Sequence, residues 1–434
     1  MAHLRIVRRR CGPQIQERFV FMNNVVTRRE ELQQLRARAD MATEYAAEMA
    51  ALRSRKDYLA EYDYFLDLLG LLPHPERFRE RFKKPLVGLT CVQAPLELVD
   101  ALGFHPYRLC AHASSRQRLV SSQLPSLACP LLKSIRGSFH LDESLERLCD
   151  LTVIPGSCDW MAKLPETLEG RAPGVHVMEL PRIRESERGQ RRWLEEVREL
   201  KRVLEKRAGR SLSRQALLRS LETHARAWRA WHLLLDARSQ SLISATWTTV
   251  ISHAFLMGDT EGWTDRVNRL LRVLREQPPL SGTRVFLAGS PIFFPNLKVP
   301  QLIEEAGMHI AGDELCSSER ILAGPALGRD RSVDGLLRSL AEQYHLGCSC
   351  PSFTDTPRRL ANLLETLHQR RISGVIYHVL KGCHPYDMDS YRYEKIIKER
   401  GFSFIRIETD LSREDGKNLL VRLEAFRDLL HERS

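Results

Sequence analysis

The stretch from residue 373 to residue 410 constrains the fold most strongly, because it contains every part of a strand–helix–strand unit. Residues 375–380 form a short apolar run rich in β-branched side chains, which is typical of a strand buried on both faces. Residues 388–400 have the pattern of a helix and residues 404–407 that of the next strand, so the unit is a βαβ motif. Cys383 follows the first strand by three residues. It is therefore predicted to lie beyond a strand's carboxyl end, where ligands bind in open parallel sheets.

The same alternation of short apolar strands and helices occurs in two separate parts of the chain. We expect strands in the first part at residues 85–90, 105–113, 151–154 and 175–181, and in the second part from residue 283, at 308–313, at 375–380 and at 404–407. These patterns predict an α/β fold in which two doubly wound parallel-sheet domains face each other across a cleft.

At 434 residues the chain is too long for one ordinary domain. We divide it into an N-terminal helical segment (1–80), a first α/β domain (81–182), a charged helical segment (183–277) and a second α/β domain (278–434). Pro73 and Pro75 are expected to close the N-terminal segment, which is predicted to pack across the first core or a partner subunit. The segment between the domains is predicted to pack partly on the first domain.

Composition limits the classes of protein that fit. The basic start is not followed by a signal-like apolar run, and no run of about 18 apolar residues occurs, so we expect a cytoplasmic protein with no membrane partner. The formal net charge is +11, but acidic residues alternate with the arginines in stretches such as 191–210. That pattern favours solvated helix faces, and no nucleic-acid-binding motif is found. We therefore expect no nucleic-acid partner.

The ten cysteines are unlike a disulfide framework, because a cytoplasmic chain keeps its thiols reduced. Six of them are predicted to lie in loops at one edge of the sheets: Cys91, Cys158, Cys316 and Cys383 follow strands within about four residues, while Cys129 and Cys350 precede helices. Cys110 and Cys149 are predicted to lie within strands or on helix faces. Thiols placed only for packing would mostly lie within strands or on helix faces, so the loop positions favour metal ligation.

Spacing alone leaves three interpretations open, which are an iron–sulfur cluster, buried structural thiols and a zinc site. Structural zinc usually takes closely spaced cysteine pairs, and Cys348-Ser349-Cys350 is the nearest approach to one. Thiolates that are far apart in sequence suit an iron–sulfur cluster better.

Several stretches between residues 84 and 429 carry a family resemblance. They are CVQAPLELVDALGFHPYRL, LACPLLKS, VIPGSCDWMAKL, GSP before KVPQLIEEAG, DELCSSER, GCSCPSF with Arg358 and Arg359, KGCHPY, and IETDLSREDGKNLLVRLEAF. In this order they resemble the 2-hydroxyacyl-CoA dehydratase and benzoyl-CoA reductase subunits, and most of all the double-cubane cluster protein branch. Three positions depart from the usual pattern: Ser290 stands where Cys is frequent, Leu411 where Tyr is usual and Asn418 where Gln is common.

The resemblance implies two Rossmann-like domains, oxygen-sensitive iron–sulfur chemistry and an ATP-dependent activator protein that supplies low-potential electrons. In the dehydratases, cysteines that match Cys91, Cys129 and Cys383 hold one [4Fe-4S] cluster. In the double-cubane branch, further cysteines that match Cys158, Cys316 and Cys350, with Cys348 as the alternate, complete an [8Fe-9S] cluster. The family also implies a homodimer.

The first hypothesis is a reductase-like redox enzyme, in which electrons from the ATP-dependent activator are stored on a double cubane between the two domains and reduce a small unsaturated or otherwise resistant substrate. Two further hypotheses keep the same fold. A 2-hydroxyacyl-CoA dehydratase subunit would carry a single [4Fe-4S] cluster that binds an acyl-CoA thioester, and would form a heterodimer. A subunit without its own activity would serve as a cluster-bearing accessory or assembly protein. No P-loop, GxGxxG fingerprint or nucleophile elbow is present, so nucleotide hydrolysis is expected on a partner.

A few other residues were candidates for the same site. His384 is a candidate proton donor, or else a turn residue satisfied by backbone. Lys133, Lys163 and Lys381 would offset cluster charge, or else lie solvated at the surface. Residues 408–410 are expected to cap the following helix or to close the cleft. Cys11, Cys110 and Cys149 are predicted to be non-ligands.

Overall fold

The computed structural model describes residues 13–111, 113–141, 149–168, 172, 174–255, 257, 259–322, 324–326 and 328–432. Its strands form two four-stranded sheets in which every described pairing is parallel. Helices lie between consecutive strands along the chain, so the predicted α/β fold with two parallel sheets is confirmed. Among the described helices, none combines the length and apolar character that a membrane crossing requires.

The first sheet has the strand order β2-β1-β3-β4. Its strands are β1 (Leu86–Leu89), β2 (His105–Arg108), β3 (Cys149–Pro155) and β4 (Val175–Met178), and its helices are α5 (Leu96–Ala101), α6 (Ser114–Val120), α7 (Pro130–Leu141) and α9 (Asp159–Thr167). β2 is shorter than the strand expected at 105–113. Leu109 still donates to Leu89 O at 3.0 Å, and the chain then leaves the sheet. The loop beyond β2 is therefore longer than predicted.

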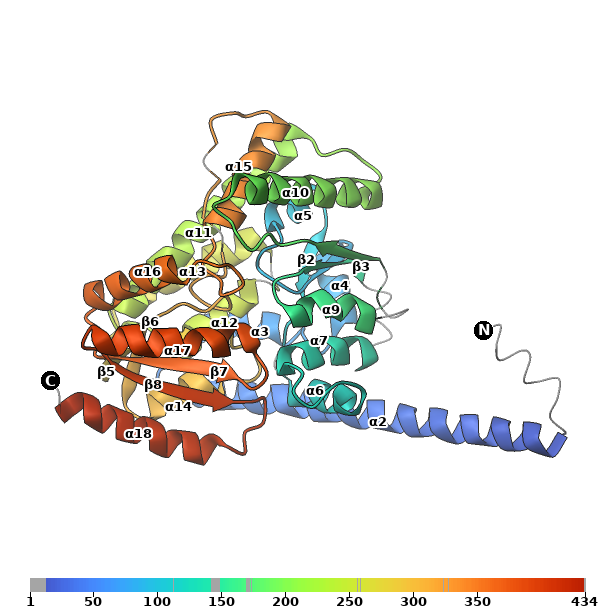
Figure 1. The fold of residues 1–434 in the computed structure, drawn as a ribbon, viewed down its shortest axis with the longest axis horizontal. Helices are drawn as coiled ribbons and strands as arrows, with labels where there is room; N and C mark the ends of the chain where they lie inside the picture. The colour runs from blue at the N-terminus through green and yellow to red at the C-terminus, as the bar shows by residue number, and fades with distance from the viewer. Residues whose placement is uncertain are drawn as a thin grey trace.

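The second sheet has the order β6-β5-β7-β8, which repeats the plan of the first. Its strands are β5 (Thr283–Gly289), β6 (Met308–Asp313), β7 (Gly374–Leu380) and β8 (Ser403–Thr409), and its helices are α14 (Lys298–Glu305), α15 (Val333–Leu346), α16 (Thr356–Gln369), α17 (His384–Glu399) and α18 (Gly416–Glu432). In Figure 1, α16 and α17 lie on one side of this sheet and α14 and α18 on the other. Gly289 ends β5 at φ +109°, where a Cβ atom would lie 1.9 Å from His378 O, so the close approach of β5 to β7 requires glycine.

The helices between the sheets pack on both halves, more than the expected partial packing on the first. They are α10 (Glu187–Ala208), α11 (Arg214–Ser239), α12 (Ala245–Phe255) and α13 (Thr260–Leu274). α11 contacts α5 of the first half and β6 of the second, and α10 contacts β4 and α15. These helices bury four tryptophans completely, namely Trp193, Trp231, Trp247 and Trp263. One hydrophobic core runs through both halves of the molecule. The expected boundaries at 81–182, 183–277 and 278–434 stay predictions.

The N-terminal segment also joins the two halves. Its elements are α2 (Pro13–Arg53), a 3₁₀ turn (Ala60–Tyr62), α3 (Asp63–Leu69) and α4 (Pro75–Phe82), and α2 projects beyond the rest of the molecule in Figure 1. α2 packs on α6 and α7, while buried Glu48 near its end accepts from Gln301 Nε2 at 2.7 Å and pairs with Arg413. Pro75 begins α4 instead of closing a helix, because proline at the first helical position loses no intrahelical hydrogen bond.

The helix after Cys383 begins earlier than predicted. α17 starts at His384, not near Met388, and Cys383 is its N-cap residue. Pro385 lies in the first turn, where its missing N–H costs nothing, so the helix can begin before the predicted residue 388. As a result, the side chains that follow Cys383 have helical positions.

Buried histidines make the fold sensitive to acid. Burial lowers the pKa of His105, His309 and His378 to about 4 and that of His253 to about 3. Below pH about 6.5 these histidines bind protons in the unfolded chain but stay neutral in the folded chain. The free energy of unfolding is therefore expected to fall as the pH falls from about 6.5 to about 4. Urea unfolding across this range measures the loss.

His309→Gln tests the contribution of one group. His309 Nε2 donates to Arg238 O at 2.8 Å, a bond that glutamine can replace, and Arg238 and Arg284 are the charged groups that further lower its pKa. The variant should flatten the pH slope by up to about 1.4 kcal/mol per pH unit. An unchanged slope would show that His309 already titrates in the folded chain as it does when unfolded.

Candidate functional site: a cavity lined by seven cysteines

One cavity of about 100 Å³ lies between the two sheets, and all six predicted ligands and the alternate line it. These residues are Cys91, Cys129, Cys158, Cys316, Cys348, Cys350 and Cys383. Most of the remaining lining is apolar, including Leu131, Met161 and Phe293. The structure therefore brings together thiols that are up to 292 positions apart in the chain, from Cys91 to Cys383 (383 minus 91).

Parallel strands explain why the thiols meet. Cys91 lies two residues beyond β1, and Cys158, Cys316 and Cys383 each lie three residues beyond β3, β6 and β7. The carboxyl ends of parallel strands lie at one edge of a sheet, and the two sheets direct these edges at the same cavity. The strand-end argument made from the sequence thus placed these four thiols correctly.

Two of the cavity thiols, those of Cys129 and Cys158, lie at the start of a helix. Cys129 immediately precedes α7, and the backbone N–H groups of Leu131 and Leu132 donate to its sulfur. Cys158 is the N-cap residue of α9; burial raises its pKa to about 11, and the nearby N–H groups of Met161 and Trp160 oppose that rise. Such amides stabilise thiolates and are the hydrogen bonds that sulfur ligands commonly accept.

Burial dominates the acidity of most of these thiols. It raises the pKa of Cys91, Cys316 and Cys348 to about 12, and neighbouring thiols raise it further. The pKa of Cys129 is lowered instead, chiefly because Cys383 hydrogen-bonds to its sulfur. A set of closely placed buried thiolates needs positive charge beside it, which bound metal supplies while the thiols release their protons.

Two arginines face the thiols without a carboxylate partner. Within the described part of the chain, neither Arg108 nor Arg320 has an acidic side chain at ion-pairing distance, and both line the cavity. Arg108 is 5% exposed, and its Nε has no hydrogen-bond partner among the described residues; the same holds for buried Nη1 of Arg320. Buried cations without a counter-ion are costly. An anionic cofactor in the cavity would balance them, so these residues fit an anionic metal–sulfur group.

The loop of Cys348 and Cys350 is held from the other half of the molecule. Gln93, two residues after Cys91, donates from Nε2 to Cys348 Sγ at 2.7 Å. Buried Arg184 donates to Cys348 O, and Arg182 Nη1 donates to Ser352 O at 3.3 Å. Residues of the other half of the molecule therefore fix the position of this loop, and one of them donates to the sulfur of Cys348.

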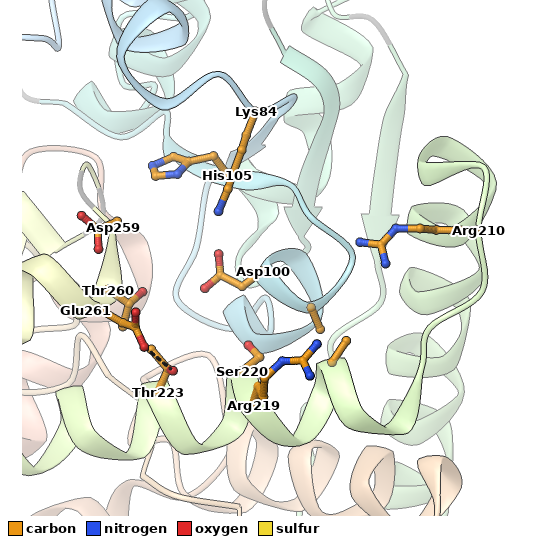
Figure 2. A pocket seen from close by; sticks show the side chains of 12 residues that line it. Lys84, Asp100, His105, Arg210, Arg219, Ser220, Thr223, Asp259, Thr260 and Glu261 are labelled. Carbon is orange, nitrogen blue, oxygen red and sulfur yellow. Dashed lines mark hydrogen bonds between the residues drawn. The ribbon is translucent and has the colours of Figure 1, made fainter.

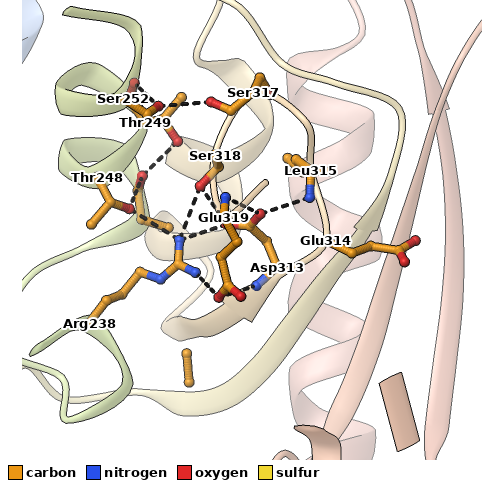
Figure 3. Close-up of polar contacts among 12 residues, drawn as sticks. Arg238, Thr248, Thr249, Ser252, Asp313, Glu314, Leu315, Ser317, Ser318 and Glu319 are labelled. Carbon is orange, nitrogen blue, oxygen red and sulfur yellow. Dashed lines mark hydrogen bonds and ion pairs between the residues drawn. The ribbon is translucent and has the colours of Figure 1, made fainter. Parts of the chain in front are cut away.

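A buried ionic network fixes the loop that carries Cys316. Figure 3 shows Arg238 of α11 directed at Asp313 and Glu319, which flank this loop. Arg238 is completely buried and donates to Asp313 Oδ2 at 2.7 Å, while Ser318 Oγ donates to the same oxygen at 2.6 Å. The helical segment between the sheets thus determines the position of one cavity thiol.

The thiols are distributed around the cavity and do not converge on one point. In the described residues, no three His, Cys, Asp or Glu side chains are grouped closely enough to hold a single metal ion. A cubane takes its cysteine ligands on different irons and therefore needs thiols spread around it. The donor set matches that requirement.

The remaining cysteines lie away from the cavity lining. Cys149 begins β3 and is buried, and Cys110 lies two residues beyond β2, outside the strand predicted for it, with Sγ 3.0 Å from Thr90 O. Neither lines the cavity. Cys11 lies outside the described residues.

The other candidates also lie outside the cavity lining. His384 is exposed, with its ring 5.7 Å from that of Trp160. Lys163 and Lys381 are exposed at the surface, and Lys133 donates to Ser126 O at 2.9 Å. The lysines therefore do not supply the positive charge at the thiols.

The segment 408–410 forms part of a separate polar cluster. Thr409 is buried, and its hydroxyl oxygen accepts a hydrogen bond from Lys298 Nζ. Asp410 Oδ1 accepts a hydrogen bond from Ser412 N at 2.8 Å in the turn before α18. Lys298 Nζ also lies 2.6 Å from Asp415 Oδ1. These contacts fix the turn that precedes α18, and none of these residues lines the cysteine cavity.

A larger surface pocket of about 460 Å³ lies at the opposite edge of the first sheet. Figure 2 shows that Lys84, Asp100 and His105 line it. Lys84 precedes β1 and His105 begins β2, so this pocket is at the amino ends of the strands. None of the seven cysteines lines it. We therefore assign the chemistry to the smaller cavity, where the strand ends and the thiols coincide.

Comparison with known families identifies the chain. Residues 91–430 match the model of the 2-hydroxyglutaryl-CoA dehydratase D-component, a span that includes every described strand except β1 and every cavity thiol. The chain belongs to this family.

Curated members of the dehydratase family match over most of their length. YjiM of Escherichia coli (strain K12), named as a dehydratase subunit, is 28% identical over 80% of this chain and 91% of its own. The (R)-phenyllactyl-CoA dehydratase beta subunit of Clostridium sporogenes is 19% identical over 85% and 98%, respectively. The (R)-2-hydroxyglutaryl-CoA dehydratase subunit beta of Acidaminococcus fermentans is 22% identical over 80% and 93%. The predicted resemblance to 2-hydroxyacyl-CoA dehydratases is thereby confirmed.

Sequence reasoning missed the polar residues that line the cavity of this dehydratase-family chain, among them Gln93, Arg108, Arg320 and Tyr386. All four lie within stretches that carried the family resemblance. Gln93, Arg320 and Tyr386 follow a cavity thiol by two to four residues, and Arg108 is the last residue of β2; these positions were the available signal.

Proposed function

We propose that this chain is the cluster-bearing subunit of an iron–sulfur enzyme, with a double-cubane [8Fe-9S] cluster in the cysteine cavity. The proposed ligands are Cys91, Cys129, Cys158, Cys316, Cys350 and Cys383, with Cys348 as the alternate to Cys350. The observation that carries the proposal is the number of thiols around one cavity, because seven exceed the four that a single cubane takes.

The proposed reaction is a reduction of a small molecule. When bound, the cluster would store low-potential electrons that an ATP-dependent activator protein delivers. The chain's own residues would ligate the cluster through thiolates, balance its charge with Arg108 and Arg320, and exclude water with the apolar lining. The same proposal makes the protein a cytoplasmic, oxygen-sensitive homodimer. His384 stays a candidate proton donor at the exposed start of α17.

A second candidate is favoured by the curated relatives, two of which are named for acyl-CoA dehydration. In this alternative the chain is a 2-hydroxyacyl-CoA dehydratase subunit, a lyase, with one [4Fe-4S] cluster and a heterodimeric partner. An open iron site would act as a Lewis acid toward the thioester carbonyl of an acyl-CoA. Cys91, Cys129 and Cys383 would be its ligands.

Iron and sulfide analysis after anaerobic purification separates the two candidates. We expect about eight irons per chain for the double cubane and about four for the single cubane. Electron paramagnetic resonance of the reduced protein supports the assignment. A chain that binds no iron under anaerobic reconstitution would contradict both candidates. A full cluster without turnover in the presence of any activator would favour the accessory-protein hypothesis.

A further inference from the structure

Tyr386 occupies the cavity position that the sequence suggested for His384. Cys383 is the N-cap of α17, and consecutive helical residues are rotated by about 100° from one another. His384 therefore points away from the cavity side, while Tyr386, three residues after Cys383, returns to it. Tyr386 is 6% exposed and lines the cavity, whereas His384 does not.

The phenol O–H of Tyr386 has no acceptor among the described residues. Its phenol oxygen accepts from Arg320 Nη2 at 3.1 Å. Arginine has no acceptor, so the phenol O–H cannot donate in return. Among the described residues the structure records no other partner for this hydroxyl. The O–H is thus left to donate to a group inside the cavity.

Arg320 has a second unused donor at the same place. Its Nε donates to Glu314 O and its Nη2 to Tyr386, while its Nη1 is buried with no partner in the described part of the chain. The Glu314 carboxylate is engaged elsewhere, with Arg359 and with Tyr393 Oη at 3.0 Å. Arg320 therefore keeps an unpartnered N–H beside the Tyr386 hydroxyl.

We propose that Arg320 and Tyr386 form a two-donor binding site for a small ligand with an anionic oxygen or nitrogen atom. The ligand would accept one hydrogen bond from Arg320 Nη1 and one from Tyr386 Oη, so that both donors are satisfied. This inference rests on the proposed function and deepens it by assigning the two side chains to binding of the substrate. The class of ligand is that of small anions or strongly polar acceptors.

Thiocyanate is a suitable probe, because it is a small anion with a nitrogen acceptor and an infrared band that reports its surroundings. Its dissociation constant is measured on the full chain, purified anaerobically, from the shifted band. Tyr386→Phe keeps the ring and removes only the hydroxyl, and is expected to weaken binding about 2- to 10-fold. Arg320→Gln removes the charge and is expected to weaken it at least about tenfold.

Tyr391→Phe is the matched control, because Tyr391 lies on the same helix and is 77% exposed. It should bind thiocyanate as the unmodified protein does. The proposal is overturned if Tyr386→Phe and Arg320→Gln also bind unchanged, as thiocyanate held only by iron would, or if the unmodified chain does not bind the probe. Iron content, measured on the same samples, reports separately on the proposed function.

Discussion

Cys383→Ala is expected to remove at least about half of the bound iron, because loss of one thiolate opens a cubane and leaves its iron labile. Cys383 is placed for ligation by three features: it follows β7, it caps α17, and its sulfur hydrogen-bonds to Cys129 from the other half of the molecule. Iron and sulfide analysis of the anaerobically reconstituted variant, with electron paramagnetic resonance, measures the loss.

Cys149→Ala is the matched control for that experiment. Cys149 is 1% exposed, more deeply buried than most of the cavity thiols, but it begins β3 away from the cavity lining. The variant should keep the iron content of the unmodified chain, with a stability loss of about 1 kcal/mol or more from the lost packing. Equal iron retention in both variants would contradict the proposed ligand set.

Arg238→Met is expected to lower the free energy of unfolding by about 3–5 kcal/mol, because it leaves the buried Asp313 carboxylate without a counter-ion, while Glu319 keeps its pair with Arg370. Methionine replaces most of the volume, so the loss reflects charge and not a cavity. Because these carboxylates flank Cys316, the variant is also expected to bind less iron than the unmodified chain. Urea unfolding and iron analysis measure the two effects.

An exposed ion pair on the same helix provides the comparison. Arg226 also lies on α11 but is 55% exposed, and it pairs with Glu261 at 2.7 Å. Arg226→Met should change stability by less than about 1 kcal/mol, since solvent screens the exposed pair. If Arg238→Met were no more destabilising than Arg226→Met, the ionic network would not be what holds the Cys316 loop.

The strands and the site loops were predictable because they depend on local patterns. The apolar runs at β1, β6 and β7 predicted the strands, and the cysteines just beyond these runs predicted which loops line the cavity. Errors arose where neighbouring structure overrides a local signal. Pro75 was expected to close a helix and the helix after Cys383 was expected from residue 388, whereas Pro75 begins α4 and Pro385 lies in the first turn of α17, where proline is favourable.

The charge and hydrogen-bond partners of the site were not predictable from local pattern. Lysines near the cysteines were the candidates for balancing cluster charge, but Lys163 and Lys381 face solvent, and Arg108 and Arg320 face the thiols instead. Likewise Gln93 meets Cys348 only because the two halves pack together. Residues that are 255 positions apart have no sequence signal for their contact.

The sequence by itself determined that the chain has two parallel sheets with thiols beyond the strand ends, because strand burial and βαβ connection are written in the order of apolar and polar residues. Only the tertiary structure decided that both sets of strand ends open on one cavity, which arginines accompany the thiols, and that Tyr386 and not His384 lines it. These features depend on how the α10–α13 helices join the two sheets through one continuous core. Packing between distant segments is set by the summed burial of many side chains, and no single stretch of sequence contains it.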